Sequence, residues 1–184
     1  VTENADKEAK KLIRKAKKTN PESAVVIIGC YAQLKPEKIA LIDGVDLVLG
    51  AEEKFNLIEH LDKISYQKRA TKIFQSQISD TKNFIPSYSY GERTRSYLKV
   101  QDGCDYTCSF CTIPQARGKS RSNTVKKTKE IAQQISNTNI REIVLTGVNI
   151  GDFGKGSSEN FLDLIQELDS VKNIDRIRIS SIEP

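Results

Sequence analysis

The sequence predicts an α/β protein of two domains, on two observations. Helix-like and buried-strand-like segments alternate along much of the 184-residue chain, which is the order expected where helices cover a largely parallel sheet. The alternation stops between residues 66 and 94, where Lys, Arg, Gln, Ser and Tyr surround isolated aromatic residues, and then resumes. We therefore expect a first domain over residues 1–65, a linker or extended edge segment over 66–94, and a second domain over 95–184.

The first domain has five periodic segments. They are, in chain order, a helix over 3–18, a strand over 24–28, a short helix after Pro36, a strand over 46–49 and a helix over 57–64. The helix over 3–18 repeats apolar residues every three or four positions, and Asn4 is its candidate N-cap. The continuous apolar run at 24–28 predicts a parallel strand covered on both faces. Asn56, followed three residues later by Glu59, resembles a capping box for the last helix.

The second domain repeats the pattern. Its expected elements are a strand over 97–100, a helix over 124–137, a strand over 142–146, a helix over 161–168 and a strand over 176–180. Because this series stops at a strand, where such a fold ordinarily continues, we expect the chain to lack its C-terminal part. The chain contains no methionine, even at Val1, so we also expect a missing N-terminal part.

The amino-acid composition excludes several classes of protein. At 38% hydrophobic and 29% charged residues, the chain is neither fibrous nor wholly disordered. No apolar run approaches the roughly 20 residues of a membrane helix, and no secretory signal is present; we expect a cytoplasmic protein with no membrane partner. The net charge is +5, and residues 66–130 hold 13 basic and 5 acidic side chains. This surplus favours a phosphate-rich partner, although a solvated charged face explains it equally well.

Three of the four cysteines lie within eight residues, in the spacing Cys104-x3-Cys108-x2-Cys111, whereas Cys30 is far away. Thiolates are soft donors that suit zinc and iron–sulfur clusters. A structural zinc site needs four ligands, and the one histidine, His60, lies in the other domain, where we expect it at the surface. Three thiolates can hold three irons of a cubane and leave the fourth iron open. Read on its own, Cys30 is better explained as a small buried residue at the end of a strand than as a metal ligand.

This spacing, with an aromatic residue before the last cysteine, resembles the signature of the radical S-adenosylmethionine (SAM) enzymes. The surrounding runs resemble the methylthiotransferases of that superfamily: 101–104, 111–114, 116–118, 120–122 and 146–151 in the second domain, and 3–6 and 29–33 in the first. The resemblance covers nearly the whole chain. It implies a flavodoxin- or Rossmann-like first domain, followed by a truncated radical SAM (β/α) partial barrel.

The resemblance also implies cofactors and site residues. Cys104, Cys108 and Cys111 would ligate a 4Fe–4S cluster whose open iron binds SAM, and Cys30 would ligate an auxiliary 4Fe–4S cluster whose other cysteines would precede Val1. The candidate cofactor-binding residues are Phe110, Gly147, Asn149, Ser180 and Ser181, and the candidate RNA-binding residues are Arg117, Lys119 and Arg121. Ser180 and Ser181 are equally well explained as polar caps of a strand end.

The implied activity is a radical SAM methylthiotransferase reaction on transfer RNA. A 5′-deoxyadenosyl radical removes hydrogen from C2 of N6-threonylcarbamoyladenosine, and sulfur from the auxiliary cluster is added and then methylated. The implied partners are transfer RNA and an electron donor such as flavodoxin or ferredoxin, and no DNA. Relatives acting on isopentenyladenosine or on a ribosomal protein are an alternative, as is a non-catalytic metal-binding RNA-binding module. With Cys30 alone, we expect this chain to be incomplete for full turnover.

Overall fold

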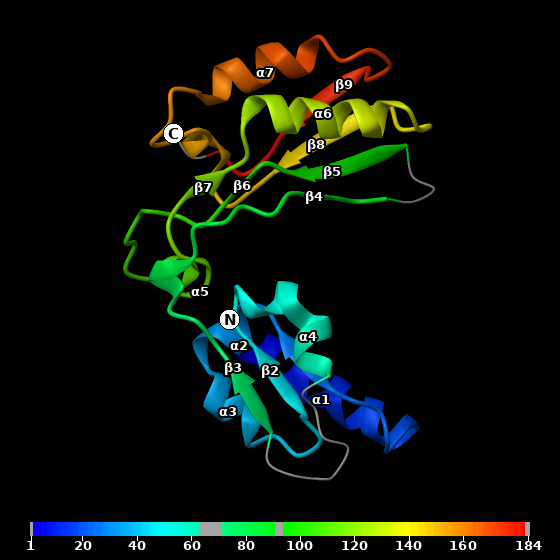
Figure 1. Ribbon diagram of the computed structural model, residues 1–184, viewed down its shortest axis with the longest axis vertical. Coiled ribbons are helices and arrows are strands. Elements are labelled where there is room, and N and C mark those ends of the chain that lie inside the picture. Colours follow the sequence, from blue (N-terminus) through cyan, green and yellow to red (C-terminus); the bar gives the residue numbers. More distant parts are fainter. Residues whose placement is uncertain (1, 63–70, 91–93, 183–184) are drawn as a thin grey trace. The chain divides into compact units, whose positions relative to one another are not determined.

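The computed structural model describes residues 2–62, 71–90 and 94–182 (Figure 1). The chain divides into two compact units. The first unit comprises Val1–Thr81 and Thr107–Gly118, and the second comprises Lys82–Tyr106 and Lys119–Pro184. Both units contain parallel β-structure with helices, which confirms the α/β prediction. Among the described residues, no helix is both long and apolar enough to cross a membrane.

The first unit is built on a three-stranded parallel sheet in the order β1-β2-β3. Its strands are β1 (Val26–Ile28), β2 (Leu47–Leu49) and β3 (Lys72–Phe74). Its helices are α1 (Glu3–Thr19), α2 (Cys30–Leu34), α3 (Pro36–Ala40), α4 (Leu57–Leu61) and α5 (Ile113–Arg117), with 3₁₀ turns η1 (Glu53–Asn56) and η2 (Ile78–Asp80). The buried core includes Ile13 of α1, Ile39 of α3 and Val48 of β2.

Three local predictions for this unit were wrong. The N-cap of α1 is Thr2, whose hydroxyl accepts a hydrogen bond from the Ala5 amide at 3.3 Å; the helix begins at Glu3, so Asn4 already lies in its first turn. Strand β1 is not covered on both faces, because Ile28 at its end is 51% exposed. The Asn56 side chain makes no cap hydrogen bond to α4. Residues 63 and 64, predicted to end that helix, lie outside the described residues.

The second unit has a four-stranded sheet in the order β4-β5-β8-β9. Its strands are β4 (Ser87–Tyr88), β5 (Arg95–Lys99), β8 (Glu142–Thr146) and β9 (Arg176–Ile179). The last three run parallel to one another, and β4 pairs antiparallel with β5. A separate two-stranded ribbon joins β6 (Gln101–Asp102) to β7 (Arg121–Ser122).

Two helices, α6 (Val125–Ser136) and α7 (Phe161–Asp169), lie side by side on one face of this sheet (Figure 1). Helix α6 turns Val125, Thr128, Ala132 and Ile135 into the protein, and Thr124 caps its start. The fully buried side chains include Leu98 and Leu145 from the sheet and Leu164 from α7. Burial of this apolar layer is the main favourable contribution to folding of the unit.

The described part of segment 66–94 supplies edge strands. Strand β3 extends the first sheet beside β2, and β4 extends the second beside β5. With three and two residues respectively, these strands are too short to show periodicity in the sequence. The division into a first domain over 1–65, a linker over 66–94 and a second domain over 95–184 stays a prediction.

Candidate cluster and cofactor site

The carboxyl ends of β5, β8 and β9 meet at one edge of the second sheet. In the parallel register Lys99 lies opposite Thr146, and Leu145 opposite Ile179. The chain therefore leaves the three strands at the same level, into segments 100–104, 147–149 and 180–181. Ligands of α/β proteins bind at this edge. Four predicted cofactor residues and the first cysteine of the loop thus lie on segments that leave the sheet together.

Gly147 and Asn149 form the central segment of this edge. A Cβ on Gly147 would lie 2.6 Å from Cγ2 of Ile150 and 2.9 Å from Oε1 of Gln101, so the backbone occupies a space that has no room for a side chain. Asn149 is buried at 4% exposure, and its side-chain oxygen accepts a hydrogen bond from the Gly151 amide at 3.3 Å. That bond starts the 3₁₀ turn η3 (Ile150–Asp152).

Ser180 and Ser181 lie beside this segment. The Ser180 hydroxyl donates to the Leu145 carbonyl at 2.7 Å. Ser181 is exposed and has a left-handed backbone with φ 54°, and its carbonyl accepts from the Ile150 amide at 3.0 Å. Ser180 therefore binds strand β8 and Ser181 binds the turn η3, and the Ser180 hydroxyl already has a partner. Their contact with a cofactor stays a prediction.

The side chain that connects these segments is Gln101, for which no separate role was predicted from the sequence. It is fully buried, and its Oε1 accepts from the amides of Val148 and Asn149, each at 2.9 Å. Its Nε2 donates to the Gly103 carbonyl at 2.7 Å and to the Ser120 hydroxyl at 2.9 Å. No sequence periodicity marks it, because it follows the strand β5. Its partner Gly103 is two positions away, but Ser120, Val148 and Asn149 are 19 to 48 positions away.

The cysteine loop carries three free thiols without helix or strand between Gly103 and Thr112. Cys104 is half-buried in the second unit; Cys108, which is exposed, and Cys111, which is half-buried, belong to the first. The Cys111 amide donates to the Cys108 carbonyl at 3.0 Å, which makes a turn between them. Across residues 2–62, 71–90 and 94–182 no group of three His, Cys, Asp or Glu side chains is arranged to hold a metal ion. The ligand set therefore stays a prediction, but three unpaired soft donors on one short loop fit the chemistry of an iron–sulfur cluster.

The start of this loop is anchored by two carboxylates. Asp102 accepts from the Gly103 amide and pairs with the Arg121 guanidinium at 3.3 Å. Asp105 accepts from the Ser120 amide at 2.9 Å and pairs with the Lys155 ammonium at 3.1 Å. The Ser120 hydrogen bond is the largest cause that lowers the pKa of Asp105, and Asp105 in turn raises the pKa of Lys155.

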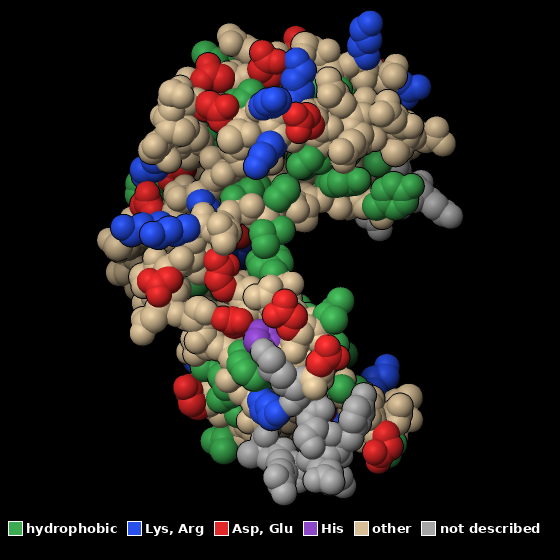
Figure 2. Space-filling view, viewed as in Figure 1, with side chains coloured by type: hydrophobic (Ala, Val, Ile, Leu, Met, Phe, Trp, Pro, Cys, Tyr) green, Lys and Arg blue, Asp and Glu red, His purple; other side chains and the backbone are tan. Residues whose placement is uncertain are grey.

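The three predicted RNA-binding cations differ in their surroundings. Arg117, in the first unit, and Lys119, in the second, are exposed. The Arg121 side chain is only 14% exposed, and besides Asp102 it donates to the carbonyls of Asn83 and Lys119. On the face in Figure 2, basic and acidic side chains are interspersed over the second unit. RNA contact by these residues stays a prediction.

Cys30 begins helix α2 and is half-buried. Helix α2 packs against α5, which begins two residues after Cys111. The element that carries Cys30 and the element that follows Cys111 therefore pack together within the first unit. Phe110, between Cys108 and Cys111, is 88% exposed. None of its contacts within the described residues indicates that it binds a cofactor.

The prediction that His60 lies at the surface was wrong. The side chain is 6% exposed, its Nε2 is 3.0 Å from Oε2 of Glu53, and its ring stacks on Phe74 at 4.3 Å between centroids. The turn η1 and strand β3 bury it, and neither of these short elements is predictable from the sequence pattern. His60 therefore has a packing role within the first unit.

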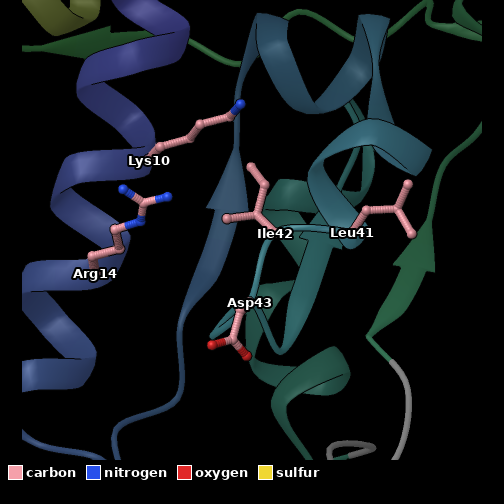
Figure 3. A pocket seen from close by; sticks show the side chains of 5 residues that line it. All are labelled: Lys10, Arg14, Leu41, Ile42 and Asp43. Atoms are coloured by element: carbon pink, nitrogen blue, oxygen red, sulfur yellow. The ribbon is translucent and has the colours of Figure 1, made fainter.

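A hollow of about 340 Å³ lies elsewhere in the first unit (Figure 3). Lys10 and Arg14 extend into it from α1, opposite Leu41, Ile42 and Asp43. None of the predicted site residues lines it. The hollow mixes charges of both signs with aliphatic side chains, and it contributes nothing to the cluster site.

Comparison with known proteins identifies two family patterns in the chain. Residues 98–184 match the Radical SAM superfamily, and residues 1–50 match the uncharacterized protein family UPF0004. The first match begins within β5 and includes the cysteine loop and all three carboxyl-end segments. The second includes α1, β1, α2, α3 and β2.

Several curated proteins are similar over the whole chain. The threonylcarbamoyladenosine tRNA methylthiotransferases MtaB of Bacillus subtilis and Aquifex aeolicus are each 36% identical, over 100% and 99% of this chain. A tRNA-2-methylthio-N(6)-dimethylallyladenosine synthase of Rickettsia akari is 31% identical over 95%. The chain spans 41%, 45% and 41% of the length of these three relatives.

Proposed function

The chain belongs to the radical SAM methylthiotransferase family, and on that premise we propose that it is the cluster-bearing part of an enzyme that methylthiolates C2 of N6-threonylcarbamoyladenosine in transfer RNA. Relatives named for that substrate support this choice, with identities of 36% against 31% for one named for dimethylallyladenosine. We also propose that the first unit is flavodoxin-like and that the parallel strands of the second begin a (β/α) barrel.

The observation that carries the proposal is the juxtaposition at the carboxyl edge of the second sheet. The segment entering the cysteine loop, the Gly147–Asn149 segment and the Ser180–Ser181 segment leave parallel neighbouring strands at one level. Hydrogen bonds join the three, through Gln101 and through the bond from the Ile150 amide to the Ser181 carbonyl. A bound cofactor at this edge would be in reach of residues from several strands, as is usual in barrel enzymes.

In this proposal Cys104, Cys108 and Cys111 hold one 4Fe–4S cluster, and Cys30 is a ligand of a second. The clusters and SAM, when bound, supply the radical that removes hydrogen from C2 and the sulfur and methyl groups that replace it. The residues of the chain hold the site in place: Asp102 and Asp105 fix the entry to the cysteine loop, and the packing of α2 on α5 brings together the elements next to Cys30 and Cys111. An electron donor such as flavodoxin or ferredoxin is the proposed partner for reduction.

The test is release of 5′-deoxyadenosine from SAM by the anaerobically reconstituted, reduced chain. We expect the wild-type chain to release it and the Cys104→Ala, Cys108→Ala, Cys111→Ala triple variant to release none. Equal release by both would contradict the assignment. Bound zinc in place of iron and sulfide would instead favour a non-catalytic metal-binding module.

The substrate is tested separately. Anticodon stem-loop RNAs carrying N6-threonylcarbamoyladenosine, isopentenyladenosine or unmodified adenosine are offered to the chain, and affinity is measured. We expect the first to bind most tightly. Mass spectrometry of the nucleosides after incubation with SAM and reductant is expected to show no methylthio product from this chain, because Cys30 alone is a poor anchor for the sulfur-donating cluster.

A further inference from the structure

Gln101 is the only glutamine of the second unit's described residues that is fully buried, and all its polar capacity is used. A buried side-chain amide without partners is costly, so a fully satisfied one implies that its surroundings were built around it. Its partners are not neighbours in a strand ladder. They belong to three separate segments: the entry to the cysteine loop at Gly103, the residue before β7 at Ser120, and the Val148–Asn149 segment after β8.

The contact with the Val148–Asn149 segment is specific in shape. Two consecutive backbone amides converge on the single Oε1 atom of Gln101, each at 2.9 Å, which fixes the direction of both peptide groups. Gly147 brings the backbone close enough for this, since a Cβ there would approach Oε1 to 2.9 Å. A side chain of another length would not place an acceptor between these amides.

The contact with the cysteine loop uses the other end of the same amide. Nε2 donates to the Gly103 carbonyl at 2.7 Å, and Cys104 is the next residue. Gly103 itself has a left-handed backbone with φ 73°, so its orientation depends on this hydrogen bond and on the one its amide donates to Asp102. One rigid side chain therefore links the first cluster cysteine to the segment of Gly147 and Asn149.

We propose that Gln101 is a positioning residue for cofactor binding. It fixes the Cys104 end of the cysteine loop and the Gly147–Asn149 segment relative to each other, so that SAM bound to the open iron contacts a segment that is already in place. This inference rests on the proposed function, because it assumes the cluster and SAM. Of the three side chains compared, only glutamine supplies both the acceptor and the donor. Glutamate keeps an acceptor for Val148 and Asn149 but loses the donor to Gly103 and places a carboxylate against that carbonyl. Methionine has a similar length but supplies neither the acceptor nor the donor.

The experiment compares Gln101→Met and Gln101→Glu with Gln33→Met. Gln33 is a matched control, because it is also buried and its side chain also binds backbone groups, accepting from Ala51 and donating to Ser76, but within the first unit. Iron content is measured first. SAM affinity is then measured on the reconstituted, reduced chain from the change in its electron paramagnetic resonance spectrum, and amide hydrogen exchange of Val148 and Asn149 is measured without SAM.

We expect Gln101→Met to raise the dissociation constant of SAM about tenfold and Gln101→Glu to raise it less, about threefold. Exchange at Val148 and Asn149 should be faster in Gln101→Met and nearly unchanged in Gln101→Glu, which keeps the acceptor. Gln33→Met should lower the melting temperature but leave the SAM dissociation constant within twofold. If Gln101→Met fails to fold, the Gln101→Glu variant carries the affinity test.

Two results would overturn the inference. One is an unchanged dissociation constant in both Gln101 variants at wild-type iron content. The other is an equal rise in Gln33→Met, since that would reveal only a general loss of stability. A wild-type chain that binds iron and sulfide but shows no response to SAM would refute the proposed function instead, and Gln101 would then be left without a cofactor to position.

Discussion

Replacing Gly147 by alanine tests whether the carboxyl-edge segment is as closely packed as the structure indicates. The added Cβ would lie 2.6 Å from Cγ2 of Ile150, 2.9 Å from Oε1 of Gln101 and 3.1 Å from Cβ of Gln101. Ile150 and Gln101 are both fully buried, so neither has free space to move into. The backbone of Gly147 has no left-handed φ. The whole cost of the substitution therefore comes from overpacking.

Overpacking a well-packed interior costs about 1–3 kcal/mol. Two contacts below 3.0 Å against buried groups place Gly147→Ala near the middle of that range, at about 2 kcal/mol. In a chain of this size each 1 kcal/mol lowers the melting temperature by about 2–4 °C. We therefore expect a decrease of about 4–8 °C, together with weaker SAM binding, because the clash displaces the Gln101 acceptor from the amides of Val148 and Asn149.

The assay is thermal unfolding followed by far-ultraviolet circular dichroism, with Gly156→Ala as the control. A Cβ on Gly156 meets no atom within 4 Å, so its cost is limited to the left-handed backbone at φ 84°, about 1 kcal/mol. Gly147→Ala should therefore be the less stable variant, and the only one of the two with weakened SAM affinity. A melting temperature for Gly147→Ala equal to that of wild type would refute the packing described for this edge.

Three further predictions concern charged groups. The pKa of Asp105 is lowered in the folded state, so the carboxylate stabilises the fold above its ordinary pKa of about 4, and this stabilisation is lost as the pH falls through the lower folded-state pKa. The free energy of unfolding of Asp105→Asn, measured from pH 7 to pH 3, should therefore fall less steeply below pH 4 than that of wild type. Asp46→Asn, which loses its ion pair with Lys17 at 2.9 Å, should cost about 1–2 kcal/mol in urea unfolding, and an unchanged midpoint would count against that pair. Neutralising Arg117 and Lys119 together should weaken RNA binding and lower the slope of log affinity against log salt by about 1 to 2, whereas an unchanged slope would show that neither cation contacts phosphate.

Much of the fold could be predicted because long periodic segments define it. The helices near residues 3–18 and 124–137 and the strand at 142–146 agree with the structure to within about two residues. Short elements could not be predicted. Helix α2 and strand β4 are stabilised by tertiary contacts, and with five and two residues they show no period of their own.

The site shows the same division. The resemblance to the radical SAM methylthiotransferases indicated Gly147 and Asn149, and the structure places both at the carboxyl end of a strand, where such barrels bind cofactors. Their contact with a cofactor stays a prediction. His60 was misplaced, since its burial comes from Glu53 and Phe74, and Phe74 lies in an edge strand that the sequence does not reveal. The role of Gln101 could not be predicted, because what distinguishes it is its hydrogen bonds to the distant Ser120 hydroxyl and the distant amides of Val148 and Asn149.

The most direct test of the central claim is the iron and acid-labile sulfide content of the chain after anaerobic reconstitution. The account predicts about four of each per wild-type chain, a similar content in the Cys30→Ala control, and almost none when Cys104, Cys108 and Cys111 are together replaced by alanine. Cys30 is the only other cysteine in the sequence, and a single thiolate is a poor anchor for a cubane cluster. Full iron and sulfide in the triple variant, or zinc without sulfide in the wild type, would contradict it.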